Sequence, residues 1–165
     1  MSGVFASLAK GAGDLLRKKE IVGRLEPHDR LDGKTCLVTG ASSGLGRAVA
    51  KQMAERGARV VLAARRPIEE LGEGEESAYL DLLRFDSIVR FVDDLAARKL
   101  VFDVVVFNAG VVAREHRLSP EGYDEMLQVN FLSKVLMAKL LLGRGLVRGA
   151  EITEARRPPA AGPGG

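Results

Sequence analysis

The chain has 165 residues, of which 46% are hydrophobic and 28% charged, and its formal net charge is +3. This composition is typical of a single globular domain, and the small, scattered positive charge argues against nucleic-acid binding. The one cysteine, Cys36, excludes an intramolecular disulfide and favours a reducing compartment. No apolar run approaches the roughly 20 residues of a membrane span, so we expect a cytoplasmic protein.

Residues 1–31 form an extension ahead of the first strand signal. The extension combines short apolar pairs, such as Leu15 with Leu16, with a basic cluster at residues 17–19. This pattern favours an amphipathic helix that docks on the domain or on a second subunit. A helix lying on a membrane surface is the alternative.

Residues 32–142 carry the pattern of a parallel α/β domain. Apolar runs without polar alternation indicate strands buried on both faces, and segments with helical spacing separate them. Strands are predicted up to Thr39, over residues 58–63, within 77–82 with an end near Asp81, and within 102–110. Helices are predicted over residues 44–56, around Ile88, Phe91, Val92 and Leu95, and from the N-cap Ser119 and first-turn Pro120 to about Leu142.

Right-handed crossovers between four such strands give the sheet order 3-2-1-4. The predicted fold class is α/β, a Rossmann-like doubly wound parallel sheet that is partial because later strands are missing. The fourth strand is then an apolar sheet edge, which invites association. Residues 143–165 are rich in Gly, Pro, Ala and Arg without a sustained apolar period, so we expect a disordered tail.

Glycine-rich residues follow the first predicted strand directly, in the stretch TGASSGLG. A strand, a glycine turn and a helix in this order form an anion site, because helix N-terminal N–H groups are unpaired and glycine lets a phosphate approach. The alternative is a tight turn that needs glycine for its geometry alone. The predicted phosphate-binding residues are Gly40, Ser42, Ser43, Gly44, Leu45 and Gly46.

The residues after the second predicted strand bear on the kind of dinucleotide that this site would accept. A ribose 2′-hydroxyl is usually bound by an acidic residue there, and a 2′-phosphate by a basic one. This sequence has Arg65 and Arg66, with no carboxylate before Glu69. Because guanidinium groups suit phosphate, NADP(H) is favoured over NAD(H). The alternative is that both arginines are solvated residues at the start of a loop.

Over about residues 32–142 the chain resembles the short-chain dehydrogenase/reductase family. TGASSGLG is similar to the family's TGxxxGxG loop, LDL to its adenine-contacting segment, NAG to its NNAG motif with Phe107 in place of the first Asn, and VNFLS to its catalytic-Asn segment. The surrounding LSPEGYDEMLQVNFLS is similar to the retinol-dehydrogenase-like branch. The resemblance implies cofactor-binding roles for Asp81, Leu82, Asn108, Ala109 and Gly110, and a catalytic role for Asn130.

The family's catalysis also uses a serine on a fifth strand and a Tyr-x-x-x-Lys pair. In this sequence Tyr79 is followed four residues later by Leu83, and Tyr123 by Leu127. We therefore expect a truncated family member that is inactive alone, with no metal site. The resemblance implies an NADP(H)-dependent oxidoreductase that acts on an alcohol or carbonyl. We expect activity on such a substrate only if other residues complete the catalytic site. The alternatives are a non-catalytic dinucleotide-binding module and an interaction fragment that forms homo- or hetero-oligomers.

Overall fold

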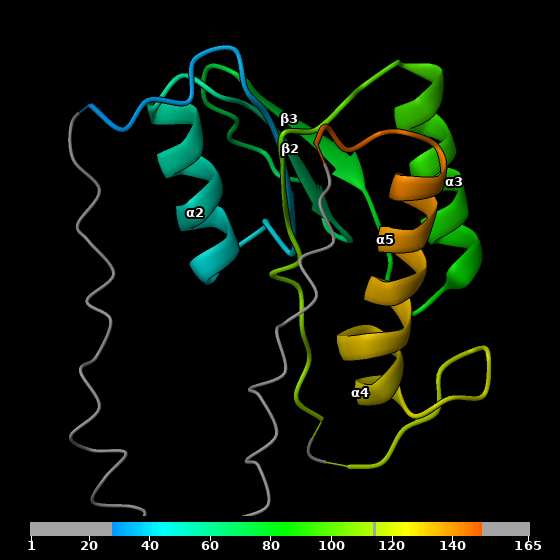
Figure 1. Ribbon diagram of the computed structural model, residues 1–165. Coiled ribbons are helices and arrows are strands. Elements are labelled where there is room, and N and C mark those ends of the chain that lie inside the picture. The colour runs from blue at the N-terminus through cyan, green and yellow to red at the C-terminus, as the bar shows by residue number, and fades with distance from the viewer. Residues whose placement is uncertain (1–27, 114, 150–165) are drawn as a thin grey trace, which may run out of the picture.

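A four-stranded parallel sheet with the order β3-β2-β1-β4 lies at the centre of the structure (Figure 1). The computed structural model describes residues 28–113 and 115–149. The strands are β1 (Thr35–Thr39), β2 (Arg59–Ala64), β3 (Glu75–Tyr79) and β4 (Val104–Val106). The predicted order and the parallel α/β class are confirmed, whereas the helix predicted in residues 1–31 falls almost entirely outside the described residues.

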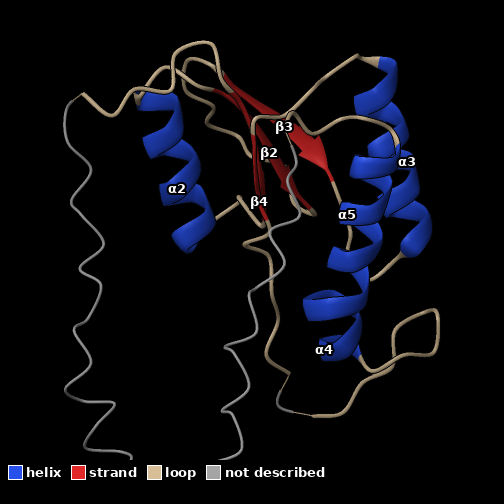
Figure 2. Ribbon diagram, in the orientation of Figure 1, coloured by secondary structure: helices blue, strands red, loops and turns tan. Residues whose placement is uncertain are grey.

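Helices cover both faces of this sheet (Figure 2). Helix α2 (Gly44–Glu55) packs on one face, and α3 (Phe85–Ala97) and α5 (Ser133–Gly143) pack side by side on the other. The short α4 (Glu125–Leu127) and the π-helical segment η1 (Gln128–Leu132) run directly into α5. The molecule is therefore a three-layer arrangement, as a doubly wound sheet requires.

Two apolar clusters explain why the strand sequences lack polar alternation. One cluster lies between the sheet and helices α3 and α5, and includes Leu37 and Val61. The other lies between the sheet and α2, and includes Val38 and Leu62. Each central strand thus buries side chains on both faces. The predicted apolar face of α3 is confirmed, since all four of its residues are buried: Ile88, Phe91, Val92 and Leu95.

Strand β3 begins and ends earlier than the sequence pattern predicts. It opens with Glu75 and Glu76, whose carboxylates pair with Arg47 (2.6 Å) and Arg59 (2.7 Å). Ion pairing lets an edge strand carry acidic residues that an apolar pattern does not reveal. The apolar residues after Tyr79 are buried in a turn and do not extend the strand.

The long helix starts at Glu125, and the prediction that it starts at Ser119 is wrong. The side chain of Asp124 caps the helix by accepting a hydrogen bond from Leu127 N at 2.9 Å. The Ser119 hydroxyl instead accepts from Tyr123 N (3.2 Å), within a turn in which Gly122 has φ +81°. A residue with this φ cannot continue a right-handed helix, so Ser119 and Pro120 belong to the preceding turn.

Ordered packing continues beyond the predicted boundary at residue 142. Leu146 is buried, and Val147 forms a parallel bridge with Phe102 just before β4. Phe102 N donates to Leu146 O and Arg148 N donates to Phe102 O, both at 2.8 Å. Apolar burial outweighs the local Gly/Arg composition here, and the rest of the predicted tail, residues 150–165, lies outside the described residues.

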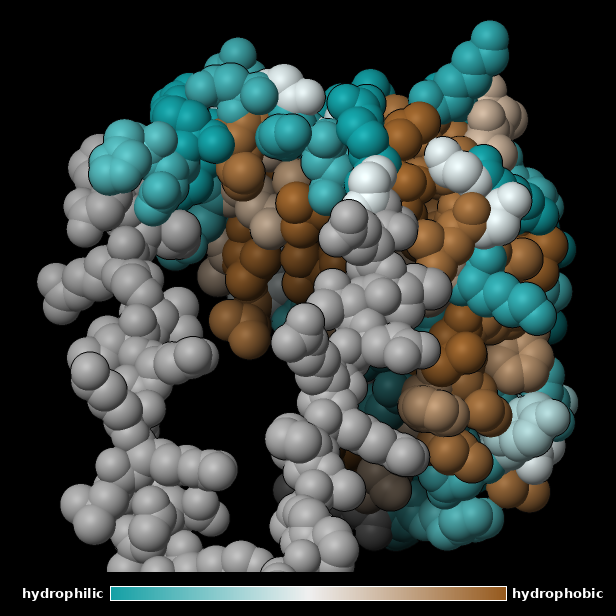
Figure 3. Space-filling model, in the orientation of Figure 1, coloured by the Kyte–Doolittle hydropathy of each residue, from teal (hydrophilic) through white to brown (hydrophobic). Residues whose placement is uncertain are grey.

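The helix Glu125–Gly143 has the length and mean hydropathy, 1.3, of a membrane span. One face packs against the core through Met137 and Leu141, with Leu136 and Leu140 beside them. Phe131 and Val135 are more than half exposed, and Figure 3 shows apolar surface along this helix. We assign the helix to the core layer because its buried face packs against α3.

Candidate functional site

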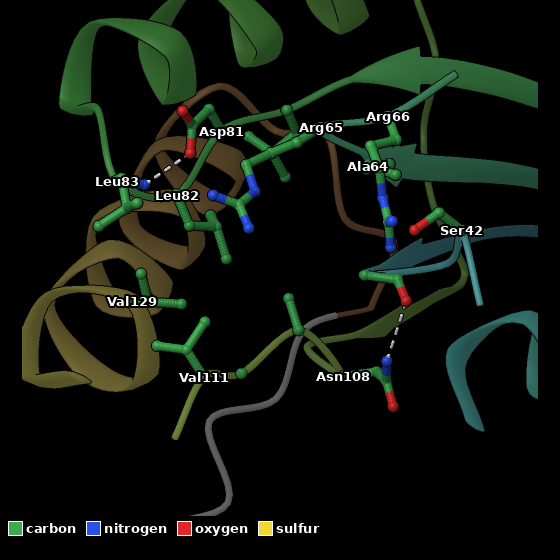
Figure 4. A pocket seen from close by; sticks show the side chains of 15 residues that line it. Ser42, Ala64, Arg65, Arg66, Asp81, Leu82, Leu83, Asn108, Val111 and Val129 are labelled. Carbon is green, nitrogen blue, oxygen red and sulfur yellow. Dashed lines mark hydrogen bonds between the residues drawn. The ribbon is translucent and has the colours of Figure 1, made fainter. Parts of the chain in front are cut away.

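A cleft of ≈ 220 Å³ lies at the carboxyl ends of all four strands (Figure 4). This is the edge at which open parallel sheets bind ligands. The cleft is smaller than the roughly 300–1,000 Å³ of pockets that enclose drug-sized ligands, so it can enclose only part of a dinucleotide. Of the predicted site residues, it is lined by Gly40, Ser42, Arg65, Arg66, Asp81, Leu82, Asn108, Ala109 and Gly110.

The remaining predicted phosphate-binding residues, 43–46, lie at the start of α2. Ser43 is the N-cap in an extended conformation and makes no side-chain capping hydrogen bond. No acidic residue occupies the first turn, and Ser43, Gly44 and Leu45 are all exposed. The N–H groups of this turn and the positive end of the helix dipole therefore face solvent, as an anion site requires.

Gly44 and Gly46 are glycine for different structural reasons. Gly44 has φ +60°, and a Cβ there would point into open space, so the backbone leaves room for a bound group. A Cβ at Gly46 would overlap the Asn108 amide and the Gly40 carbonyl, so Gly46 allows α2 to approach the strand ends. The geometry thus fits the pyrophosphate of a dinucleotide.

Thr39 and Asn108 tie the ends of β1 and β4 together. The Asn108 carboxamide donates to Thr39 O at 3.2 Å and to Gly40 O at 3.4 Å, and Figure 4 draws the bond to Gly40. The fully buried Thr39 hydroxyl donates to Val106 O (3.3 Å) and accepts from Ala109 N (3.1 Å). Asn108 therefore supports the glycine turn by donating to the backbone carbonyl groups of Thr39 and Gly40.

Residues 81–83 form a wall of the cleft in a turn after β3. Asp81 Oδ1 accepts from Leu83 N at 3.0 Å, and Asp81 N donates to the Ser87 hydroxyl at 3.0 Å. The carbonyl of Leu82 accepts from the Ser133 hydroxyl at 2.6 Å. Together with other apolar residues the wall lines one part of the cleft, which we call the apolar slot: Leu82, Leu83, Val111 and Val129.

Asn130 lies in η1, is exposed, and its carboxamide hydrogen-bonds the backbone of Val111. Its Oδ1 accepts from Val111 N at 2.9 Å, and its Nδ2 donates to Val111 O at 2.8 Å. A Cβ on Gly110 would lie 3.3 Å from Asn130 Oδ1. The structure thus gives Asn130, for which the family resemblance implied a catalytic role, a positioning contact with the segment after β4.

Arg65 and Arg66 follow β2 and are both exposed. Figure 4 shows their side chains extending into the cleft, Arg65 toward Leu82 and Arg66 near Ser42. Neither guanidinium makes an ion pair within the described part of the chain. Two positive charges are therefore free to meet an anionic group beside the glycine turn.

A family model described as short chain dehydrogenase matches residues 34–150. The chain belongs to the short-chain dehydrogenase family. The match extends to the last described residues, and the Rossmann-like sheet, the glycine turn and the strand-end cleft all lie inside it. Membership implies a nicotinamide dinucleotide as cofactor.

Individual relatives agree with this assignment. The chain is 37% identical to the dehydrogenase/reductase SDR family member FEY of Arabidopsis thaliana, a match that covers 84% of this chain and 42% of that protein. It is 30% identical to human retinol dehydrogenase 13, with 81% and 44% covered. A crystal structure of a Mycobacterium paratuberculosis protein matches with TM-score 0.62 and 32% identity, over 70% and 44% of the two chains. The chain spans less than half the length of these relatives.

A second hollow of ≈ 870 Å³ lies between α2 and the segment that leads into β3. Its cationic side chains are paired, Arg47 with Glu75 and Arg59 with Glu76 among them. Arg30 pairs with Asp32 in the same way. We assign no ligand to this hollow, because its charges are already neutralised.

Three residues that line the cleft or hold its wall in place were not identified from the sequence. Val129 lines the cleft from η1, and Ser87 and Ser133 bind the turn at residues 81–83. The only sequence signal for Ser133 was its place in VNFLS, three residues after Asn130. Its partner, Leu82, lies 51 residues away, so no local pattern could have identified the contact.

Proposed function

We propose that this chain binds NADP(H) in the strand-end cleft, as the cofactor-binding part of an oxidoreductase that acts on an alcohol or carbonyl. The observation that carries the proposal is the pair Arg65 and Arg66, unpaired within the described residues and directed into the cleft beside the turn. No carboxylate occupies residues 65–68 to favour a 2′-hydroxyl instead.

Three parts of the cofactor have matching groups in the chain. The first turn of α2 would bind the pyrophosphate, the arginines the 2′-phosphate, and the apolar slot at Leu82 and Val111 the adenine. Asn130 would orient the segment after β4 through its contacts with Val111. The bound cofactor supplies hydride transfer at its nicotinamide.

Turnover also needs a proton donor beside the substrate oxygen, a role worth about 10²–10⁴-fold in rate. The sequence contains no Tyr-x-x-x-Lys, so we propose that this chain binds the cofactor without turning it over unless other residues complete the site.

The alternative is a protein-interaction role, favoured by one observation. Phe131 and Val135 are 59% and 52% exposed on the same helix. Large apolar side chains that share an exposed helical face mark contact surfaces in other proteins. Binding of a dinucleotide separates the two functions, because an interaction surface on this helix has no need of the cleft.

Calorimetric titration of the folded chain with NADPH and with NADH tests the proposal. We expect binding of both, with NADPH the tighter, because only NADPH carries a 2′-phosphate for the arginines. A chain with a cooperative thermal transition that binds neither would exclude the dinucleotide role. Tighter binding of NADH would exclude the NADP(H) assignment alone.

A further inference from the structure

We infer that Ser133 is a positioning residue that fixes the base-binding wall of the cleft and thereby sets its selectivity for adenine. The inference rests on the proposed dinucleotide-binding function. Ser133 does not line the cleft; it acts through the backbone of Leu82, which does.

The contact is buried and short. Ser133 is 0% exposed, and its hydroxyl donates to Leu82 O at 2.6 Å. A serine within a helix can point to solvent or return its hydroxyl to the carbonyl four residues earlier. Ser133 instead reaches a residue on a different element, so its hydroxyl serves the tertiary structure and not the helix.

Three successive backbone positions of the wall are held in this way. Asp81 N is bound by the Ser87 hydroxyl of α3, Leu82 O by Ser133 of α5, and Leu83 N by the carboxylate of Asp81 itself. The side chains of Leu82 and Leu83 therefore project into the cleft from a turn with fixed backbone groups. Of these three positions, α5 holds only Leu82 O. Removal of the Ser133 hydroxyl therefore frees that carbonyl and leaves the other two contacts in place.

The opposite side of the slot is held by the same helical run. Asn130, three residues before Ser133, binds both backbone groups of Val111. Figure 4 shows Val111 facing the Leu82 and Leu83 side of the cleft, with Val129 beside them. One helical run thus binds a backbone group on each side of the slot, Leu82 O through Ser133 and Val111 through Asn130. The π-helical turn Gln128–Leu132 ends directly before Ser133 and contains Asn130.

The test compares Ser133→Ala with Ser119→Ala. Ser119 is also buried and its hydroxyl also binds a backbone group, Tyr123 N, but it does not line or contact the cleft. Each variant is titrated with NADP⁺ and with its 1,N⁶-etheno derivative, whose enlarged base reports the fit of the slot. Thermal unfolding of each variant is measured in parallel.

For Ser133→Ala we expect NADP⁺ affinity to fall about three- to tenfold, the range of one lost hydrogen bond. We expect a smaller fall for the etheno derivative, so the ratio of the two affinities declines. Ser119→Ala should keep the wild-type ratio. An unchanged ratio in Ser133→Ala, or equal wild-type affinities for the two ligands, would overturn the inference, because a purely structural loss weakens both ligands alike.

A second variant and the affinity of the wild-type chain separate the remaining outcomes. If Ser133→Ala does not fold, Ser133→Cys keeps the side-chain shape, with a somewhat larger atom and only a weak donor, and a wild-type ratio in that variant counts against the role. A folded wild-type chain that binds neither ligand refutes the proposed function itself. Wild-type binding with an unaltered ratio in the variant refutes the role of Ser133 alone.

Discussion

The carboxamide of Asn130 forms a pair of hydrogen bonds with the backbone of Val111, accepting from its N–H at 2.9 Å and donating to its carbonyl at 2.8 Å. The pair joins η1 to the segment after β4, across 19 residues of sequence. Val111 lines the cleft, so the contact transmits the position of the helix to the binding site.

Replacement of Asn130 by alanine should weaken NADPH binding more than it weakens the fold. Loss of the pair leaves Val111 free to move, and we expect about a tenfold rise in Kd, on the scale of two partly exposed hydrogen bonds. Calorimetric titration measures the effect. Lys139→Ala changes an exposed residue on the same helical run, and equal affinities of the two variants would show that the Asn130 contact is dispensable.

Reversal of charge at Arg65 should change cofactor selectivity. Arg65→Glu removes a donor for the 2′-phosphate and places a carboxylate beside it, so we expect about a 10- to 100-fold loss of NADPH affinity. NADH affinity should stay within about threefold, since it lacks that phosphate. Arg117→Glu makes the same charge change at an exposed residue outside the cleft. A parallel loss of both cofactors in Arg65→Glu would contradict the assigned role.

Alanine at Gly46 should destabilise the chain, because its Cβ would overlap the Asn108 amide and the Gly40 carbonyl. We expect the free energy of unfolding to fall by about 1–3 kcal/mol, as for other overpacked sites. Gly143→Ala is the matched control, since a Cβ there meets nothing within 4 Å. Denaturant unfolding of both variants provides the comparison, and similar midpoints would mean that α2 can move away from the strand end.

Stability should fall in acid partly through Glu75. Burial alone would raise the pKa of Glu75, but hydrogen bonds from Arg47 and Gly72 N–H outweigh it and lower the pKa. A lowered folded-state pKa contributes stability above the unfolded value of about 4.3 and loses it as pH falls through the folded value.

Glu75→Gln should therefore flatten the stability profile below about pH 5, with its largest cost at neutral pH where the ion pair is formed. Thermal unfolding from neutral pH to acid measures the profile. Glu69→Gln alters an exposed carboxylate that makes no ion pair within the described part of the chain, and it should leave the profile unchanged. A wild-type slope in Glu75→Gln would show that other carboxylates dominate acid unfolding.

Several assignments follow from short-range patterns alone. The continuous apolar runs at β1 and β2 predicted a parallel sheet, because only strands covered on both faces bury every side chain. The turn at residues 40–46 was predictable because glycine, strand and helix signals are adjacent in sequence. The NADP(H) preference and the cytoplasmic location stay predictions.

The predicted element boundaries were wrong where a local sequence signal was compatible with more than one structure. Ser119 and Pro120 fit a helix start as well as a turn, and Gly122 with its left-handed φ decided for the turn. The predicted position of strand β3 was too late in the chain. The observed strand begins with acidic residues that arginines on other elements, Arg47 and Arg59, stabilise. Such pairing has no signature within the strand itself.

The sequence by itself determined the class of sheet, the order of its strands and the position of the glycine turn, since these depend on hydrophobic periodicity and on glycine within a few residues. Tertiary structure alone decided how the cleft is held. The contacts of Ser133 with Leu82 and of Asn130 with Val111 span 51 and 19 residues. A serine or asparagine can bond many backbone groups, and only the packing of η1 and α5 against the strand ends selects the partner.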